Sequence, residues 1–233
     1  MQLVLLDGYI AYHDVVNLFQ DIKTGVAEEK IFILEHQDVY TAGKSVNISN
    51  DGDVAYRVHG VEAIRTERGG LWTWHGKGQV VAYFIYNLKK HKSNLSEFLH
   101  KIEGATLHAI WDEVVRSSDN NIQCGHIYCY ADSNRRGFWV KYRRSLTEPE
   151  YTAKFGFIGL RVSHGYVCHG ISINYNNDLQ WFDYINPCGL GEVNIASVET
   201  ILQDNQLLKK PLDINDFKKK LGYKLLEALD ETR

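Results

Sequence analysis

A glycine-rich aromatic segment offers the first candidate site. It reads Arg-Gly-Gly-Leu-Trp-Thr-Trp-His-Gly-Lys-Gly-Gln from Arg68 to Gln79. Glycine lets a backbone approach a ligand closely, so glycine-bearing turns at both ends of a short strand would bring several N–H groups together. Two plain hairpin turns also explain the glycines, but Arg68 and His75 beside them favour a site. The spacing is not GxGxxG and no helix start follows, which disfavours a dinucleotide.

A cysteine between proline and glycine is the second candidate. In Pro187-Cys188-Gly189, one residue with a fixed φ and one permissive residue would hold the thiol on a rigid loop. A thiolate presented in this way is a nucleophile. A lone cysteine is more often a small buried apolar residue, so the tripeptide by itself leaves both interpretations open.

A lysine begins the apolar, glycine-rich run Lys-Phe-Gly-Phe-Ile-Gly at Lys154. On an edge strand, such a lysine would block aggregation. In an apolar pocket, it would instead be a base with a perturbed pKa. The local sequence does not choose between these two roles.

The three remaining cysteines raise the question of a metal. Cys124, His126 and Cys129 fall within six residues, and Cys168-His169 is the one pair that could complete a zinc site. Structural zinc usually shows two ligand pairs of similar spacing. Residues on a strand alternate between its faces, so the first three cannot all point the same way. We therefore expect no metal.

The elements that must position these residues are mostly strands. Apolar, β-branched and aromatic runs bounded by Gly, Asp and Asn predict strands at 2–6, 30–36, 61–67, 71–75, 79–88, 126–131, 137–142, 154–162 and 166–175, the last two joined by a tight turn at 163–165. Apolar residues at the 3.6-residue period predict helices at 11–23, 95–115 and 214–229. Asn94 and Glu97 resemble a capping box at the start of the second helix.

These elements favour an α+β fold, because hairpin-like neighbours outnumber βαβ units. We expect one domain over residues 1–233, with a mixed, mostly antiparallel sheet flanked by helices. Internal repeats and linkers that would divide the chain are absent from the sequence.

Composition excludes several classes of protein. With 233 residues, 44% hydrophobic and 24% charged, the chain is typical of globular proteins and needs no disulfide or metal to hold a core. The net charge of −3 provides no field for nucleic acid. No apolar run approaches the roughly 20 residues that span a bilayer, and the first residues do not resemble a signal peptide. We expect a cytoplasmic protein with reduced cysteines that binds neither nucleic acid nor membrane.

Four motifs in this order resemble the lipoyl(octanoyl) transferases, the octanoyltransferases of protein lipoylation. The motifs are Arg68–Gln79, Lys154–Gly159, His169–Asn174 and Pro187–Gly189, and segments 34–36 and 40–43 also match. The resemblance covers most of the chain. Trp74 stands where the family has tyrosine, Lys77 stands where it has proline, and 141–151 looks like an enlarged loop.

The resemblance implies the catalytic fold of the lipoate and biotin protein ligases and an acyltransferase that uses no cofactor. An octanoyl group would pass from octanoyl-acyl carrier protein to Cys188, and then to a lysine of a lipoyl domain. The acceptors would be 2-oxoacid dehydrogenase complexes and the glycine cleavage H protein. Lys154 would stabilise the thiolate and take a proton from the acceptor amine. His75 or His169 would orient a group or act as an alternative base.

The matching motifs also imply an acyl-binding wall. An eight-carbon chain offers about seven groups to bury, each worth roughly 0.8 kcal/mol, so chain-length selection needs an apolar tunnel. The expected substrate-binding residues are Arg68, Gly69, Gly70, Leu71, Trp72, Thr73, Trp74, His75, Phe157, Ile158, Gly159, Gly170, Ile171 and Ser172.

Two other functions remain open at this point. An ATP-dependent lipoate- or biotin-type ligase would activate a free acid as an adenylate and would need no cysteine. A non-catalytic relative would only bind acyl groups or lipoyl domains.

The densest basic cluster would dock an acidic carrier protein or form a solvated loop face. It consists of Arg135, Arg136, Lys141, Arg143 and Arg144.

Overall fold

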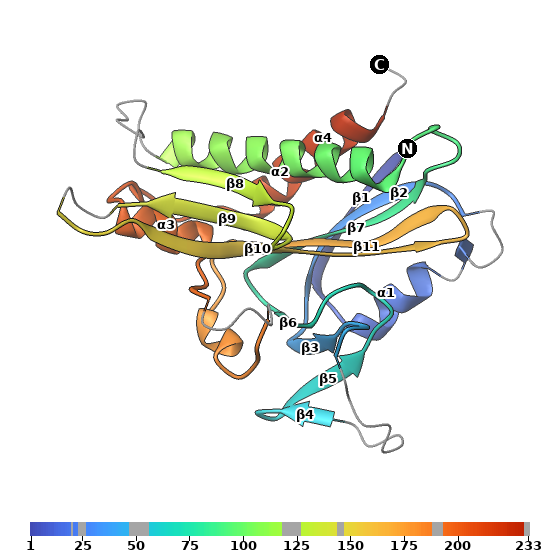
Figure 1. The fold of residues 1–233 in the computed structure, drawn as a ribbon, viewed down its shortest axis with the longest axis horizontal. Coiled ribbons are helices and arrows are strands. Elements are labelled where there is room, and N and C mark those ends of the chain that lie inside the picture. Colours follow the sequence, from blue (N-terminus) through green and yellow to red (C-terminus); the bar gives the residue numbers. More distant parts are fainter. Residues whose placement is uncertain are drawn as a thin grey trace.

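A seven-stranded sheet forms the centre of the computed structural model, which describes residues 1–19, 21–22, 27–46, 56–117, 127–143, 147–187 and 193–230. The strand order is β1-β2-β7-β11-β10-β9-β8 (Figure 1). The strands are β1 (Gln2–Ile10), β2 (Lys30–His36), β7 (Gln79–Asn87), β8 (Tyr128–Asp132), β9 (Gly137–Tyr142), β10 (Tyr151–Ser163) and β11 (Tyr166–Asn174). β1 and β2 are parallel, and every other neighbouring pair is antiparallel.

A second, smaller sheet has the order β4-β5-β3-β6 and lies below the main sheet in Figure 1. Its strands are β3 (Val39–Ala42), β4 (Tyr56–Val58), β5 (Val61–Arg65) and β6 (Trp72–His75). β3 pairs in parallel with β5 and antiparallel with β6. The predicted α+β class with a mixed, mostly antiparallel sheet is therefore confirmed.

Helices cover the opposite face of the main sheet. Figure 1 shows α2 (Leu95–Ser117) and α4 (Ile214–Leu229) together on that face, with α3 (Val198–Asp204) at one end. Their apolar stripes pack on the inward residues of β2, β7, β9, β10 and β11 to form the largest core cluster. α1 (Tyr12–Leu18) lies against the other face, where Val15 joins a smaller cluster with residues of β2, β7 and β11.

Side-chain caps define where the two long helices begin. The Glu97 N–H donates to Asn94 Oδ1 at 3.0 Å, and the Asn94 N–H donates to Glu97 Oε2 at 3.3 Å. The expected capping box is thus confirmed. Asp213 caps α4 by accepting from the Asn215 and Asp216 N–H groups.

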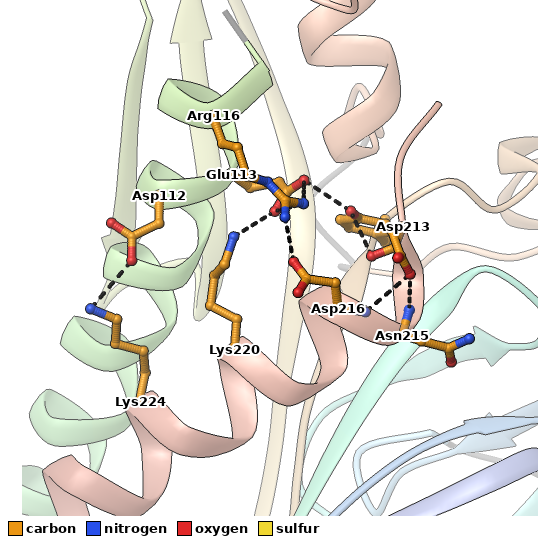
Figure 2. Close-up of polar contacts among 9 residues, drawn as sticks. Asp112, Glu113, Arg116, Asp213, Asn215, Asp216, Lys220 and Lys224 are labelled. Atoms are coloured by element: carbon orange, nitrogen blue, oxygen red, sulfur yellow. Dashed lines mark hydrogen bonds and ion pairs between the residues drawn. The ribbon is translucent and has the colours of Figure 1, made fainter. Parts of the chain in front are cut away.

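A buried carboxylate joins α2 to α4 (Figure 2). Glu113 is 1% exposed and accepts from Lys220 Nζ at 2.8 Å, from Arg116 at 2.9 Å and from the Tyr175 hydroxyl at 3.1 Å. Tyr175 directly follows β11. The cluster therefore ties both helices to the end of a central strand.

The structure agrees with most of the predicted elements and corrects several. The helix predicted at 11–23 ends at Leu18, and β3, β4 and α3 were not predicted. The tight turn after β10 is confirmed, with φ of 52° at His164 and 87° at Gly165, as a hairpin turn with two positive φ values requires.

Candidate functional site

A β-bulge in β10 sets which side chains face the site. Lys154 pairs with Trp139 and Gly156 pairs with Phe138, so Phe155 is an extra residue on β10. The bulged Phe155 packs in the core under the helices. After it, Phe157 lies on the opposite side, in the core cluster of the small sheet. The bulge therefore puts Lys154 and Phe157 on one face although they are three residues apart.

A cavity of about 530 Å³ lies on this face and is lined by segments that are distant in sequence. Lys154 lines it together with 13 of the expected substrate-binding residues, namely Arg68, Gly69, Gly70, Leu71, Trp72, Thr73, His75, Phe157, Ile158, Gly159, Gly170, Ile171 and Ser172. The wall also contains Ser45, Val81, Tyr83, Leu95, Asn134, Arg135, Arg136, Leu160 and Pro187. Three of the four sequence motifs thus meet around one cavity, and the fourth contributes Pro187.

Trp74 is the exception among the expected substrate-binding residues, and the structure corrects its placement. Its side chain is 1% exposed and packs on Trp181 and Phe182, with ring centroids 6.0 and 5.9 Å away. Trp74 and Lys77 line a separate hollow rather than this cavity. Thr73 and His75, the residues on either side of Trp74 in β6, line the cavity instead. Neither of the two departures from the family motif lies in the cavity wall.

Lys154 is buried within the sheet, at 5% exposure. β10 is paired with β9 on one side and β11 on the other, so the edge-strand interpretation of this lysine is wrong. Nζ donates to the Arg136 carbonyl oxygen at 2.8 Å and lies 4.9 Å from the centre of the Phe157 ring. A carbonyl oxygen and the face of an aromatic ring both stabilise an ammonium group.

Cys188 lies outside the described residues, but residues on both sides of it are close to the lysine. Pro187 lines the cavity that Lys154 lines. Further along the chain, Asn194 O accepts from the Lys154 N–H at 2.8 Å, and the Ala196 N–H donates to Lys154 O at 2.9 Å.

Arg68 lines the cavity, but its guanidinium binds the protein backbone. It donates to Thr41 O at 2.7 Å, to Leu71 O at 2.8 Å, to Gly69 O at 3.1 Å and to the Thr41 hydroxyl at 2.9 Å. Burial lowers the pKa of Arg68. The expected substrate-binding arginine therefore holds the glycine loop against β3.

His75 presents an acceptor nitrogen, because a chain of amides fixes its tautomer. Gln79 Nε2 donates to Asn174 Oδ1 at 2.9 Å and to Trp74 O at 3.1 Å, so Gln79 Oε1 accepts from His75 Nδ1 at 2.6 Å. His75 Nε2 then carries the lone pair. Burial, followed by the neighbouring His36, holds the pKa of His75 well below its usual range, so the ring is neutral at neutral pH.

Tyr83 adds a polar group to the cavity wall that the sequence did not reveal. His36 Nδ1 donates to Ile10 O at 2.8 Å, so the Tyr83 hydroxyl donates to His36 Nε2 at 2.9 Å. Burial lowers the pKa of His36 to about 4 and raises that of Tyr83 well above its usual range. In sequence, Tyr83 is one apolar position in a strand and carries no signal of this role.

His169 lies behind the cavity wall rather than in it. It lies in β11 with a φ of 60°, and its ring centre is 5.2 Å from that of Phe19. Burial, then the positive charges of Arg68 and Arg161, lower the pKa of His169 to about 4. The next residue must be glycine, because a Cβ on Gly170 would lie 1.7 Å from Ala82 O. Gly170 thus allows β11 to lie close to β7 beside the cavity.

In the basic cluster, Arg135 and Lys141 form ion pairs, whereas Arg136 and Arg143 are exposed. Arg135 bonds Asp132 at 2.9 Å and stacks over Trp139, and Lys141 pairs with Glu150 at 3.6 Å. Arg136 is exposed and lines the cavity mouth together with Arg135. Arg143 is exposed beyond the end of β9, and Arg144 lies outside the described residues.

Within the described ranges, no group of three His, Cys, Asp or Glu side chains is placed to hold a metal ion. Cys129 and Cys168 belong to different core clusters, on β8 and β11, with two strands between them. Cys124 and His126 lie outside those ranges. None of the helices in the described part of the chain combines the length and apolar character needed to cross a membrane.

Comparison with known proteins identifies the family of this chain. The profile of the lipoyl protein ligase A/B catalytic domain matches residues 15–225. An octanoyltransferase of Bacteroides fragilis (strain YCH46) is 31% identical over 204 residues, which cover 87% of this chain and 82% of the relative. An octanoyltransferase of Burkholderia pseudomallei (strain K96243) is 30% identical over 222 residues, which cover 95% and 87%.

Solved structures share the fold at low identity. Lipoate-protein ligase A bound with ATP aligns with a TM-score of 0.59 at 12% identity, over 98% of this chain and 86% of that chain. A bi-partite lipoate protein ligase from Thermoplasma acidophilum aligns with a TM-score of 0.53 at 10% identity, over 98% and 84%. The ligase-like fold implied by the motifs is thus confirmed. From the profile match and the relatives, this chain belongs to the family of the lipoyl protein ligase A/B catalytic domain.

Proposed function

We propose that this chain is a cytoplasmic octanoyltransferase whose single domain, residues 1–233, moves an octanoyl group from octanoyl-acyl carrier protein to a lysine of lipoyl domains. The observation that carries the proposal is the cavity, which joins buried Lys154 to the Arg68–His75, Phe157–Gly159 and Gly170–Ser172 segments. The relatives named octanoyltransferase support it, as does the family to which they and this chain belong.

Cys188 is the proposed acyl carrier. Its thiolate attacks the carbonyl carbon of the donor thioester, the bond to the carrier sulfur breaks, and the departing thiolate takes up a proton. The acceptor amine then attacks the acyl-cysteine carbonyl, which forms the amide and releases the Cys188 thiolate. Thioester exchange is nearly isoenergetic and amide formation from a thioester is downhill, so no nucleotide is consumed.

Lys154 is the proposed partner of this thiol. A free thiol titrates near 8.5, and an ammonium close to it favours the thiolate. Lys154 has the burial such a group needs, and it lines the same cavity as Pro187, the residue before Cys188. Once deprotonated, the same amine takes the proton that the acceptor nitrogen loses on forming the amide.

The acyl chain would lie against the apolar part of the wall. Phe157, Ile158 and Ile171 come from adjacent strands, and Val81 and Leu160 extend the surface. Burying about seven methylene and methyl groups contributes roughly 5–6 kcal/mol when they are fully desolvated. His75, with its free acceptor nitrogen, is the proposed orienter of a donor group such as the incoming amine.

An ATP-dependent lipoate ligase is the second candidate, because a structure of the same fold is described as lipoate-protein ligase A bound with ATP. A transfer assay separates the two functions. Purified protein is incubated with octanoyl-acyl carrier protein and an apo lipoyl domain, without ATP, and the mass of the lipoyl domain is followed. We expect octanoylation without ATP; a strict requirement for ATP and free octanoate would favour the ligase.

A further inference from the structure

The side chain of Lys154 is enclosed more tightly than cavity lining requires. Its Nζ is bonded to the carbonyl oxygen of Arg136, in the turn between β8 and β9. The ring centres of Trp139 and Phe157 lie 5.4 and 4.9 Å from Nζ. One turn and two strands therefore fix the position of the ammonium group.

Gly137, which follows the bonded carbonyl, is what allows the lysine to lie there. Its φ is 144°, a region that favours glycine. A Cβ at this position would lie 2.4 Å from Lys154 Cε and 3.0 Å from Nζ. Any side chain on residue 137 would therefore take the space that the lysine side chain occupies.

The bulge in β10 explains why the two residues meet. Trp139 pairs directly with Lys154, and the pairing then shifts by one residue, so that Phe138 pairs with Gly156. The first residue of β9 is thus drawn over the lysine side chain, with Gly156 O only 2.5 Å from the Cβ position of Gly137. The close approach is specific to this register.

We propose that Gly137 is a positioning residue, which, with the Arg136 carbonyl and the Phe157 ring, holds the ammonium of Lys154 where it can act on Cys188. This inference rests on the proposed function, because it assumes the thiol as the target of the lysine. In a variant with a side chain at residue 137, the lysine side chain is displaced, and the thiol keeps its proton to higher pH.

The pH dependence of thiol alkylation reports this effect with little interference. Among the residues that the structure describes, the other titratable groups on the cavity wall are Arg68, His75, Tyr83, Arg135 and Arg136. Arginine side chains in general stay protonated in this range, and burial moves the pKa of His75 well below and that of Tyr83 well above their usual ranges. Between about pH 6 and 9, the profile therefore follows the thiol.

Gly165 supplies a matched control. It also has a positive φ, 87°, so alanine there imposes comparable backbone strain. It lies in the turn after β10, and its Cβ would meet only the Lys89 side chain, at 3.4 Å or more. If Gly137 had no role in positioning the lysine, Gly137→Ala and Gly165→Ala should have the same effect on the thiol.

The test follows alkylation of Cys188 by iodoacetamide across this pH range, read by peptide mass spectrometry. We expect Gly137→Ala to raise the apparent pKa of Cys188 by about one unit, which lowers its alkylation rate near neutral pH about tenfold. Gly165→Ala should keep the wild-type profile. In a Lys154→Ala background, Gly137→Ala should add nothing, because the group through which it acts is gone. A wild-type profile in folded Gly137→Ala, or a shift that persists without Lys154, would overturn the proposal.

Two further outcomes keep the inference and the proposed function apart. If Lys154→Ala leaves the Cys188 profile unchanged, the proposed partnership of lysine and thiol fails, and this inference fails with it. If Lys154→Ala shifts the profile but Gly137→Ala does not, only the role of Gly137 is lost.

A second variant serves if the contact with Gly156 O makes Gly137→Ala too unstable to purify. Phe157→Leu leaves the backbone unchanged and keeps an apolar side chain, but removes the ring face 4.9 Å from Lys154 Nζ. An upward shift of the Cys188 profile that disappears in the Lys154→Ala background would support the enclosure as the positioning device. An unchanged profile would overturn it.

Discussion

Replacing Glu113 with glutamine tests the joint between α2 and α4. Glu113 accepts hydrogen bonds from Lys220 and Arg116 (Figure 2). It is 1% exposed and also accepts from the Tyr175 hydroxyl. Glu113→Gln keeps the shape of the side chain but removes the charge that two cations face. We expect a loss of unfolding free energy, because breaking a buried ion pair leaves its partners uncompensated.

The size of the loss follows from the exposure of the three donors. A hydrogen bond to a charged group contributes about 1.5–3 kcal/mol. The Arg116 side chain is 37% exposed, so its share is screened by water. Tyr175 and the Lys220 ammonium, whose side chain is 20% exposed, carry most of the rest. We therefore expect a loss of about 3–5 kcal/mol, or about 6–20 °C in Tm for a chain of this length.

The neighbouring residue provides the control. Asp112 also joins α2 to α4, through Lys224 at 3.3 Å, but these side chains are 46% and 34% exposed (Figure 2). Asp112→Asn should cost no more than about 1 kcal/mol. Urea unfolding followed by circular dichroism measures both variants. Equal losses, or a loss under about 1 kcal/mol for Glu113→Gln, would refute the reasoning that burial makes the difference.

Three further predictions concern the histidines and the cavity wall. Burial lowers the pKa values of His36 and His169 from 6.5 to about 4, so the unfolded chain binds protons that the folded chain does not. Stability should therefore fall as the pH drops from about 6.5 to about 4, by up to roughly 3 kcal/mol for each ring; urea midpoints that stay constant over this interval would contradict the assignment. Gly170→Ala should prevent folding, because its Cβ would lie 1.7 Å from Ala82 O. Gly104→Ala on α2, whose Cβ would have no heavy atom within 4 Å, should stabilise the protein by about 0.5–1 kcal/mol. Thermal melts compare the two variants. Trp74→Tyr should leave the preference among acyl donors of different length unchanged, because Trp74 lies outside the cavity wall. Phe157→Ala should change that preference. A shifted preference in Trp74→Tyr would place Trp74 in the acyl path.

The fold was predictable where local signals and burial agree. α2 and α4 have caps and an apolar 3.6-residue period, and the structure places α4 at the predicted residues and α2 two residues longer. β3 was missed because all four of its residues are buried, so the strand shows no alternation of polar and apolar positions. The helix expected to reach residue 23 stops at Leu18 despite its continuing apolar pattern.

The site was predictable in its members but not in its geometry. The motifs contain most of the residues that line the cavity, and of the expected substrate-binding residues only Trp74 lies outside its wall. The bulge at Phe155, which brings Lys154 and Phe157 onto one face, depends on pairing with β9 and has no local signature. The hydrogen bonds of Arg68 depend on Thr41, and the importance of Gly137 depends on Lys154. Contacts between residues this far apart in sequence are set by tertiary structure rather than by local sequence.

The most direct measurement of the proposed function is the mass of the protein itself after exposure to octanoyl-acyl carrier protein without ATP. We predict that wild-type protein gains one octanoyl group, that peptide mapping places it on Cys188, and that adding an apo lipoyl domain removes it as the domain becomes octanoylated. Cys188→Ser should gain no thioester-linked octanoyl group. An unmodified wild-type protein that still octanoylates the lipoyl domain, or an adduct on another residue, would contradict a mechanism in which the sulfur of Cys188 carries the acyl group.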